Sequence, residues 1–174
     1  STDGIYGKVT EKAVIEFQKA NRILIDGIAG SQTQSLLFAN PVSRSSNFTR
    51  SVSSDNLYWL SRIIHAEAEA EPYSGKVAVG NVILNRVNSD LFPNTIYGVI
   101  FEYYKNIPQF SPVADGTIYK NPSAASIQAA RDALNGVRPV GNSTYFFNPD
   151  KAAATWIVQN KTYYTRIGDH VFYK

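Results

Sequence analysis

The amino-acid sequence predicts an α+β fold in which most of the chain is helical and a small antiparallel β-sheet stands at the C-terminal end. Two helical patterns meet at the corner Pro72-Tyr73-Ser74-Gly75 within residues 57–87, and a third begins after Asn121-Pro122. The last part of the chain instead alternates and is rich in aromatic residues, which is typical of strands. Because the helices precede the strands and no βαβ alternation appears, the pattern does not favour a parallel sheet.

The composition is that of a packed globular protein of 174 residues, with 44% hydrophobic and 18% charged residues. This length fits one ordinary domain, or one domain plus a fragment of another. Seventeen basic and fourteen acidic residues give a net charge of +3, and no basic run is long enough to indicate nucleic acid binding. The mildly basic balance is compatible with an anionic polymer as partner.

Several chemistries are excluded by missing residues or motifs. The chain has no Cys, which excludes disulfides, thiolate catalysis and Cys-ligated metal sites. The two histidines, His65 and His170, form neither an HExxH motif nor a His pair, so we expect no metal and no cofactor. No apolar run approaches the ~20 residues of a membrane span. No signal-like segment stands at Ser1, and we expect a mature or truncated form of an exported, monomeric protein.

The N-terminal region contains an internal repeat, DGIYGKVT at residues 3–10 and DGIAGSQT at residues 26–33. An Asp-Gly turn, a second Gly and then a Thr form a turn-into-helix pattern, which predicts Thr10 and Thr33 as helix N-caps. We therefore expect a small helical module over residues 1–40.

Residues 41–55 are rich in serine and poor in large apolar residues, which predicts a linker. Ser54 or Asp55 at its end is placed to cap the next helix. A larger domain is then expected over residues 56–174.

The first helix of this domain carries the strongest candidate for chemistry, Glu67. Its apolar positions recur with helical spacing and Glu67 continues the same stripe, formed by Leu57, Leu60, Ile63 and Ile64. A carboxyl group in apolar surroundings has a raised pKa and can act as a general acid. Glu69 falls on the polar side and is expected to be solvated. Glu71 lies one turn after Glu67, just before Pro72 ends the helix.

The second helix is predicted to begin at a Ser74 cap and to bury one stripe, formed by Val79, Val82, Ile83 and Val87. Asn85 and Arg86, with Asn81, lie outside that stripe. They either contact Glu67 or a ligand's hydroxyl groups, or form a solvated helix end.

A proline-containing segment, residues 91–121, is predicted to be largely irregular. Gln109 within it either binds a ligand or lies on the surface as an ordinary polar residue. The third helix is predicted to have Asn121 as cap, Pro122 in the first position and Gly136 as stop. Its predicted buried stripe is Ile127, Ala130 and Leu134.

Four C-terminal segments have strand-like sequences: 144–148, 155–158, 161–165 and 170–173. Tyr145 and Trp156 are our candidates for stacking on flat ligands, and core packing is the alternative for both.

The segment after Glu67 carries a motif that resembles the SleB/CwlJ family of spore cortex-lytic cell-wall hydrolases. The motif comprises Glu67-Ala68, Glu71-Pro72-Tyr73, Gly75, Val77-Ala78-Val79 and Leu84-Asn85-Arg86-Val87. Family-like pieces follow, including Gln109-Phe110-Ser111 and Ile167-Gly168 with His170 and Phe172-Tyr173. Glu69-Ala70 departs from the family pattern. The N-terminal repeat resembles the peptidoglycan-binding domain found beside many such hydrolases, without the helix that precedes its first Asp-Gly, so we expect a partial module.

The resemblance implies a lysozyme-like catalytic domain and lytic transglycosylase activity on cortex peptidoglycan containing muramic-δ-lactam. Glu67 would be the single acid and base. Glu71 would have a structural or positioning role, such as fixing the side chain of Arg86. The supporting residues expected at the site are Asn85, Gln109, Phe110, Ser111, Tyr145, Phe147, Asn148, Trp156 and His170. The implied location is the spore cortex or the periphery of the inner spore membrane, and a spore protein that inhibits or stabilises the enzyme is left open.

Two other functions stay open at this level. A hydrolytic muramidase or glucosaminidase would use Glu67 with Glu71 and a water molecule. A non-catalytic wall-binding protein would use the aromatic segments as a glycan platform.

Overall fold

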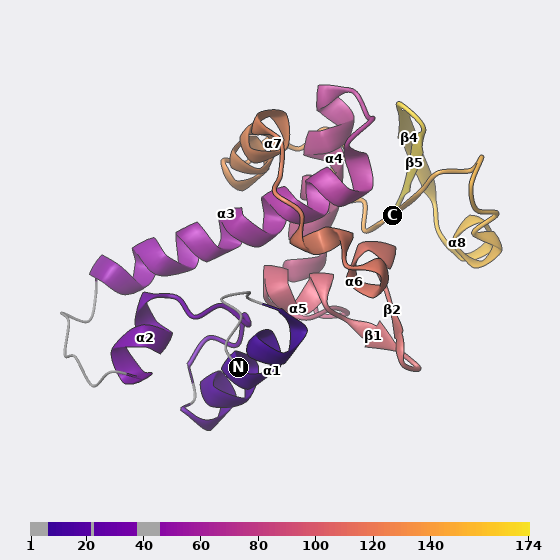
Figure 1. Ribbon diagram of the computed structural model, residues 1–174. Helices are drawn as coiled ribbons and strands as arrows, with labels where there is room; N and C mark the ends of the chain where they lie inside the picture. Colours follow the sequence, from indigo (N-terminus) through magenta and orange to yellow (C-terminus); the bar gives the residue numbers. More distant parts are fainter. Residues whose placement is uncertain (1–6, 22, 38–45) are drawn as a thin grey trace. The chain divides into compact units, whose positions relative to one another are not determined.

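The computed structural model describes residues 7–21, 23–37 and 46–174, and Figure 1 shows the order of their elements. The chain forms two compact units, Ser1–Asn56 and Leu57–Lys174, which are described separately. The predicted α+β class is confirmed, since the described residues are mostly helical with two small antiparallel sheets. None of the described helices has the length and apolar character needed to cross a membrane.

The first unit contains helices α1 (Lys8–Ala20) and α2 (Ser31–Leu37). Helix α1 begins earlier than predicted, because Gly7 is extended and its carbonyl accepts a hydrogen bond from Glu11 N–H at 3.0 Å. The predicted N-caps are therefore wrong: Thr10 and Thr33 both lie inside helices. The first Asp-Gly pair lies outside the described residues.

The second copy of the repeat is held by Gln18 of α1. The Gln18 Nε2 donates to Asp26 Oδ1 at 2.6 Å and to Thr33 Oγ1 at 3.1 Å, and its Oε1 accepts from Gly27 N–H at 2.9 Å. Gln18, Asp26 and Thr33 are buried, so each needs such partners. The Asp and Thr of the repeat therefore fix a turn against α1, which is a different role from capping.

Helix α3 (Ser46–Ala68) begins well before the predicted start at Asn56 or Leu57. Residues 46–55, assigned to a linker by composition, are helical, and Ser54 and Asp55 lie within the helix and do not cap it. No Gly or Pro stands between Ser46 and Glu71, so nothing in the sequence interrupts the helix once it has started.

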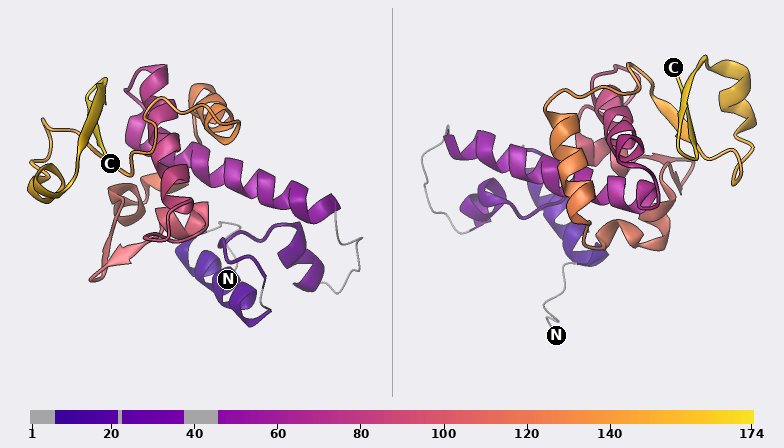
Figure 2. Two further views of the ribbon diagram at one scale, coloured as in Figure 1. Left: turned by 180° about the vertical axis from the view of Figure 1, so that it is seen from behind. Right: turned by 90° about the horizontal axis from the view of Figure 1, so that it is seen from above.

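Helix α4 (Tyr73–Val87) forms the centre of the second unit, and Figure 2 shows α7 (Ala124–Leu134) beside it. It is buried on nearly all sides, so the predicted single stripe was too narrow and Asn81 is fully buried. A Cβ added to Gly80 would lie 2.8 Å from Ile64 Cδ1 of α3 and 3.1 Å from Ala133 Cβ of α7. Both helices therefore pack closely against α4 at this glycine. The predicted Ser74 cap is also wrong, because Pro72 occupies the N-cap position.

The segment after α4 contains more regular structure than predicted. It forms α5 (Ile96–Ile100), the hairpin β1 (Tyr103–Tyr104) and β2 (Ile107–Pro108), α6 (Ser111–Asp115) and the 3₁₀ helix η1 (Thr117–Tyr119). Trp59 of α3 is 2% exposed and contacts aromatic rings of this segment edge-on, namely Tyr97, Phe101 and Tyr119. This aromatic packing orders short elements that local propensity alone does not predict.

Helix α7 has Ser123 as its N-cap, since the Ser123 hydroxyl accepts from Ser126 N–H at 3.2 Å, so the predicted Asn121 cap is wrong. Gly136 follows the helix with φ +98°, as its predicted stop role requires. The buried face consists of Ser126, Ala129, Ala130 and Ala133. Of the predicted stripe, Ala130 is therefore confirmed, whereas Ile127 is only partly buried and Leu134 is exposed.

The C-terminal sheet has the order β3-β5-β4, with β3 (Tyr145–Phe147), β4 (Tyr163–Ile167) and β5 (His170–Tyr173), and both pairings are antiparallel. Residues 155–158, predicted as a strand, belong instead to α8 (Thr155–Asn160). Trp156-Ile157-Val158 is a continuous apolar run without alternation, and such short runs fit either helix or strand. Phe172 of β5 packs with Ala78 and Val82 of α4, which attaches the sheet to the helical core.

Candidate active site

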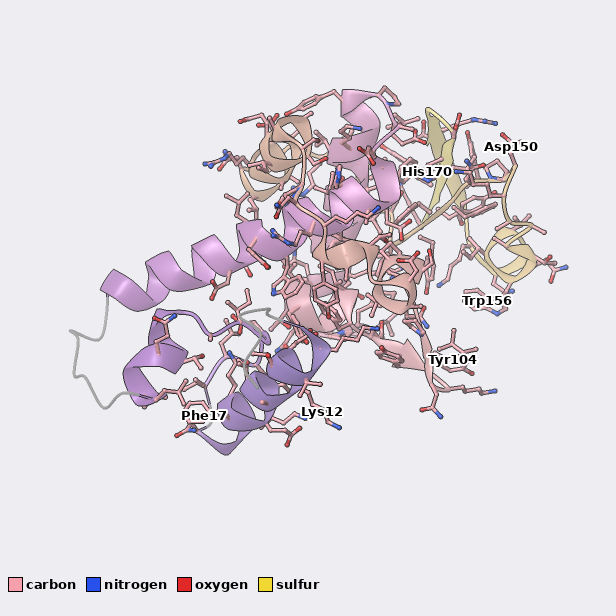
Figure 3. The ribbon with its side chains drawn as sticks, in the orientation of Figure 1. Lys12, Phe17, Tyr104, Asp150, Trp156 and His170 are labelled. Atoms are coloured by element: carbon pink, nitrogen blue, oxygen red, sulfur yellow. The ribbon has the colours of Figure 1, made fainter. Side chains whose placement is uncertain are left out.

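A cavity of about 1220 Å³ lies in the second unit. It exceeds the roughly 300–1,000 Å³ of small-molecule pockets, so it has room for a ligand larger than a typical small molecule. Ten of the twelve residues that the sequence nominated line it: Glu67, Arg86, Gln109, Phe110, Ser111, Tyr145, Phe147, Asn148, Trp156 and His170. Tyr104 of the β1–β2 hairpin, Trp156 of α8 and His170 of β5 come from three separate segments (Figure 3). Glu71 and Asn85 do not line the cavity.

Glu67 lies near the C-terminal end of α3, where the helix reaches the cavity. Leu60, Ile63 and Ile64, the apolar positions before it, are fully buried, and Glu67 itself is partly buried. Burial raises the pKa of Glu67 to about 7, and the negative charge of Asp115 adds to the effect, whereas the positive charges of Arg86 and Lys151 oppose it. Glu67 therefore holds its proton up to neutral pH, as a general acid must.

The charge of Asp115 is expected to shift the pH dependence of a reaction in which Glu67 is the general acid. Hydrogen bonds from Thr117 Oγ1 at 2.7 Å and Thr117 N–H at 2.8 Å keep the pKa of Asp115 below its usual value, so it stays ionised. Replacing it in Asp115→Asn removes a charge that raises the pKa of Glu67. The alkaline limb of the rate profile should then move to lower pH by roughly half a unit at low salt, and less at high salt because the carboxylate is exposed.

The matched control for this variant is Asp90→Asn. Asp90 is also exposed, but its charge is not among the causes of the raised pKa of Glu67. Rate profiles of both variants would be recorded at low and high ionic strength. An alkaline limb that stays in place in Asp115→Asn at low salt would contradict the assignment.

Arg86 of α4 is buried and lines the cavity beside aromatic rings. Its Nε donates to Thr144 O at 2.7 Å, and its guanidinium carbon lies 5.0 Å from the centre of the Phe92 ring and 5.1 Å from that of Phe110. Arg86 interacts electrostatically with Glu67 and Glu102. The expectation that Glu71 holds Arg86 is therefore wrong, since Thr144 and the aromatic rings do so.

Asn85 has a structural role in this arrangement. Its Nδ2 donates to Gly141 O and Ser143 O, both at 2.8 Å, and its Oδ1 accepts from Asn81 Nδ2 at 3.3 Å. The amide is thus used to attach the loop before β3 to α4. The expectation that Asn85 contacts Glu67 or a ligand is not met by these contacts.

Glu71 is turned toward the β4–β5 hairpin. Its Oε2 accepts a hydrogen bond from Asp169 N–H at 3.0 Å, and its Oε1 lies 3.7 Å from His170 Nδ1. Its side chain is only 7% exposed. This carboxylate connects the end of the catalytic helix to the sheet and is not available to activate water in the cavity.

Lys76 of α4 fixes the corner between the two helices, which the sequence reading missed. Its buried Nζ donates to three carbonyl oxygens: Ala68 and Glu69 at 2.6 Å and Glu71 at 2.9 Å. A cation at a helix C-terminus is favourable, because the last carbonyls lack partners within the helix. The only sequence signal was a lysine inside an otherwise apolar run.

An aromatic row lies along the cavity. The rings of Phe92, Tyr145 and Trp156 follow one another at centre distances of 6.0 Å, and Lys161 Nζ lies 4.7 Å from the Tyr145 ring. Trp156 is 57% exposed although it lines the cavity. A partly exposed aromatic row of this kind provides flat apolar surface beside polar groups.

Other lining residues were not nominated as site residues by the sequence. They include Glu102, Ile107 and Lys151. The sequence places them in a proline-containing loop and a polar turn, and only the fold brings them to the cavity. Among the described residues, no group of three or more His, Asp or Glu side chains is placed to hold a metal ion.

A carboxyl group that stays protonated near neutral pH, in a large cavity lined by aromatic and basic side chains, can supply the general acid that cleavage of a glycosidic bond requires. Comparison with known proteins gives the family. A family model described as Cell Wall Hydrolase matches residues 70–173, and one described as putative peptidoglycan binding domain matches residues 1–37. The chain belongs to the SleB/CwlJ family of cell-wall hydrolases and is an enzyme that acts on peptidoglycan.

The relatives support this assignment in sequence and structure. A spore cortex-lytic enzyme of Bacillus cereus is 36% identical over 201 aligned positions, which cover 99% of this chain and 75% of the relative. Cell wall hydrolase CwlJ of Bacillus subtilis is 30% identical over 122 positions, covering 66% of this chain and 82% of the relative. The solved catalytic domain of the germination-specific lytic transglycosylase SleB from Bacillus anthracis has a TM-score of 0.62 and 42% identity, covering 77% of this chain and 99% of that one.

Proposed function

We propose that this enzyme is a lytic transglycosylase that cleaves the bond between N-acetylmuramic acid and N-acetylglucosamine in spore cortex peptidoglycan during germination. The observation that carries the proposal is the contrast between two neighbouring glutamates. Glu67 lines the cavity with a pKa of about 7, whereas Glu71 is held by the β4–β5 hairpin. This contrast supports a mechanism in which one carboxyl group, that of Glu67, serves as both acid and base.

In this mechanism Glu67 first acts as the acid. It donates its proton to the glycosidic oxygen as the bond from that oxygen to muramic C1 breaks, which frees the N-acetylglucosamine hydroxyl. The resulting Glu67 carboxylate then accepts the proton of the muramic C6 hydroxyl while that oxygen bonds to C1. The product is a 1,6-anhydro end, and Glu67 is protonated again. Arg86 and Lys151 stabilise the intermediate carboxylate, since their charges favour ionised Glu67.

We assign glycan binding to the aromatic row and the first unit. Trp156 and Tyr145 stack on sugar rings, and Gln109, Ser111 and Asn148 contribute polar contacts from the cavity wall. Residues 1–40 contribute a peptidoglycan-binding module, and residues 56–174 form the catalytic domain. Muramic-δ-lactam is the cortex-specific substrate feature, and the enzyme acts as an exported monomer at the cortex or the inner-membrane periphery of the spore.

A hydrolytic muramidase is the second candidate, favoured by one observation. Glu102 is a second carboxylate that lines the same cavity, and it is coupled electrostatically to Arg86. A water molecule activated by Glu102 would give a reducing muramic end in place of an anhydro end. In that reading the second carboxylate is Glu102 and not Glu71.

Mass spectrometry of the muropeptides released from purified spore cortex distinguishes these functions. We expect anhydromuramic ends, because ring closure needs only Glu67. Reducing muramic ends would establish hydrolysis and make Glu102 the partner to test. Binding of intact strands without release of muropeptides would contradict both catalytic mechanisms.

A further inference from the structure

A buried histidine lies beside the cavity in a position that the mechanism above does not use. His170 lines the same cavity as Glu67, although its side chain is only 8% exposed. Its Nδ1 is buried without a hydrogen bond and lies 3.7 Å from Glu71 Oε1. This nitrogen therefore faces a carboxylate. The other ring nitrogen, Nε2, is the atom of His170 that is left to contact a ligand in the cavity.

The carboxylate beside His170 cannot easily turn away. Its Oε2 accepts from Asp169 N–H, and its own backbone carbonyl accepts from Lys76 Nζ at 2.9 Å. Gly168 lies directly against the carboxylate. The imidazole is also fixed, since the Phe146 ring meets it edge-on at 5.1 Å between ring centres. Both members of the pair are thus preorganised.

We propose that His170 is a second substrate-contacting residue and that Glu71 is its positioning residue. The Nδ1 keeps its proton toward Glu71, and the unprotonated Nε2 accepts a hydrogen bond from a hydroxyl group of the glycan bound beside Glu67. The inference rests on the proposed function, because it takes a glycan as the ligand. At 3.7 Å the Nδ1–Oε1 separation is longer than a hydrogen bond, so Glu71 positions the ring by electrostatic attraction.

The charges around His170 favour the neutral ring that this role needs. The charged groups facing it are Glu71 at the helix corner, Asp169 in the hairpin turn and Lys151 after β3. Burial lowers the pKa of His170, and Lys151 lowers it further, against the opposing effects of Glu71 and Asp169. The ring is therefore neutral at pH 7, and its protonation should form the acidic limb of the rate profile.

Two substitutions distinguish the role of Nδ1 from that of Nε2. The amide of Asn lies near the position of Nδ1, and the longer Gln places its amide near Nε2. We expect H170N to lose about 10- to 100-fold in kcat/KM and H170Q to stay within about 5-fold of the natural enzyme. A purely structural role predicts the reverse order, because H170N keeps the contact with Glu71. An H170N variant as active as the natural enzyme would overturn the proposal.

A third variant keeps the test decisive should either histidine variant fail to fold. Glu71→Gln retains an oxygen acceptor for Asp169 N–H but removes the charge that raises the pKa of His170. The acidic limb of kcat/KM should then move to lower pH, and an unmoved limb would refute the role of the pair. Rates are scored as glycan ends of either kind, so this result is independent of whether the products are anhydro or reducing.

Discussion

Glu67→Gln should abolish lysis of peptidoglycan, with a loss of at least about 10³-fold in kcat. Gln has nearly the same shape but cannot donate a proton to the glycosidic oxygen, and general acid catalysis contributes roughly 10²–10⁴-fold to such reactions. The loss should appear as turbidity of a spore cortex suspension that no longer falls. Binding of the glycan should persist, because the aromatic row is unchanged.

The same substitution should make the protein more stable at alkaline pH. The pKa of Glu67 is about 7 in the folded protein against an ordinary value of 4.5, so the folded state binds this proton more tightly than the unfolded state. That stabilisation is complete below about pH 4.5 and is lost as the pH rises through about 7. Above pH 7 the variant, which cannot ionise, should be more stable by up to about 3 kcal/mol.

Glu69→Gln is the matched control for both effects. Glu69 lies two residues further along the chain, its side chain is 74% exposed, and it lies 3.8 Å from His65 Nε2. Activity should be unchanged and the free energy of unfolding should vary by less than about 0.5 kcal/mol. Thermal unfolding of both variants at pH 5 and pH 8 measures this, and a Glu67→Gln protein no more stable than the natural one at pH 8 would contradict the assigned pKa.

Helical periodicity was sufficient to predict where Glu67 points. The stripe of Leu60, Ile63 and Ile64 is buried, and Glu67 follows it to the cavity with a raised pKa. Asn81 was misread by the same method, because α4 is packed on nearly all sides and such a helix has no single polar face. Periodicity therefore places residues on helices with one buried face and fails on central helices.

Contacts between distant segments were the part that the sequence could not predict. The expected partner of Glu71 is Arg86, but Glu71 is held by Asp169, far along the chain. Lys76 donates hydrogen bonds to three carbonyl oxygens at the helix corner, and a single lysine forms no sequence pattern that would predict these contacts. The sequence predicts a strand around Trp156, which lies in α8, because a short apolar run fits a helix and a strand equally well. Its contacts with Tyr145 and Lys161 form only when the chain folds.

Gly168→Ala should strongly destabilise the second unit. Gly168 has φ +58°, a left-handed conformation that costs a non-glycine residue roughly 1–2 kcal/mol. A Cβ at this position would also overlap Glu71 Oε2 and lie 2.7 Å from Pro72 Cδ. Neither neighbour can give way, since Glu71 is hydrogen-bonded and Pro72 is a rigid ring at the start of α4. We expect a loss of about 3–5 kcal/mol in the free energy of unfolding.

Gly136→Ala separates the two causes of that loss. Gly136 also has positive φ, +98°, but a Cβ there would meet nothing within 4 Å. Its substitution therefore reports the backbone cost alone, about 1–2 kcal/mol, or a fall of several degrees in Tm. The excess loss in Gly168→Ala then measures how firmly the Glu71 carboxylate is held against the hairpin. Equal losses in the two variants would mean that Glu71 moves aside freely, and the β4–β5 hairpin would then not be fixed to the helix that carries Glu67.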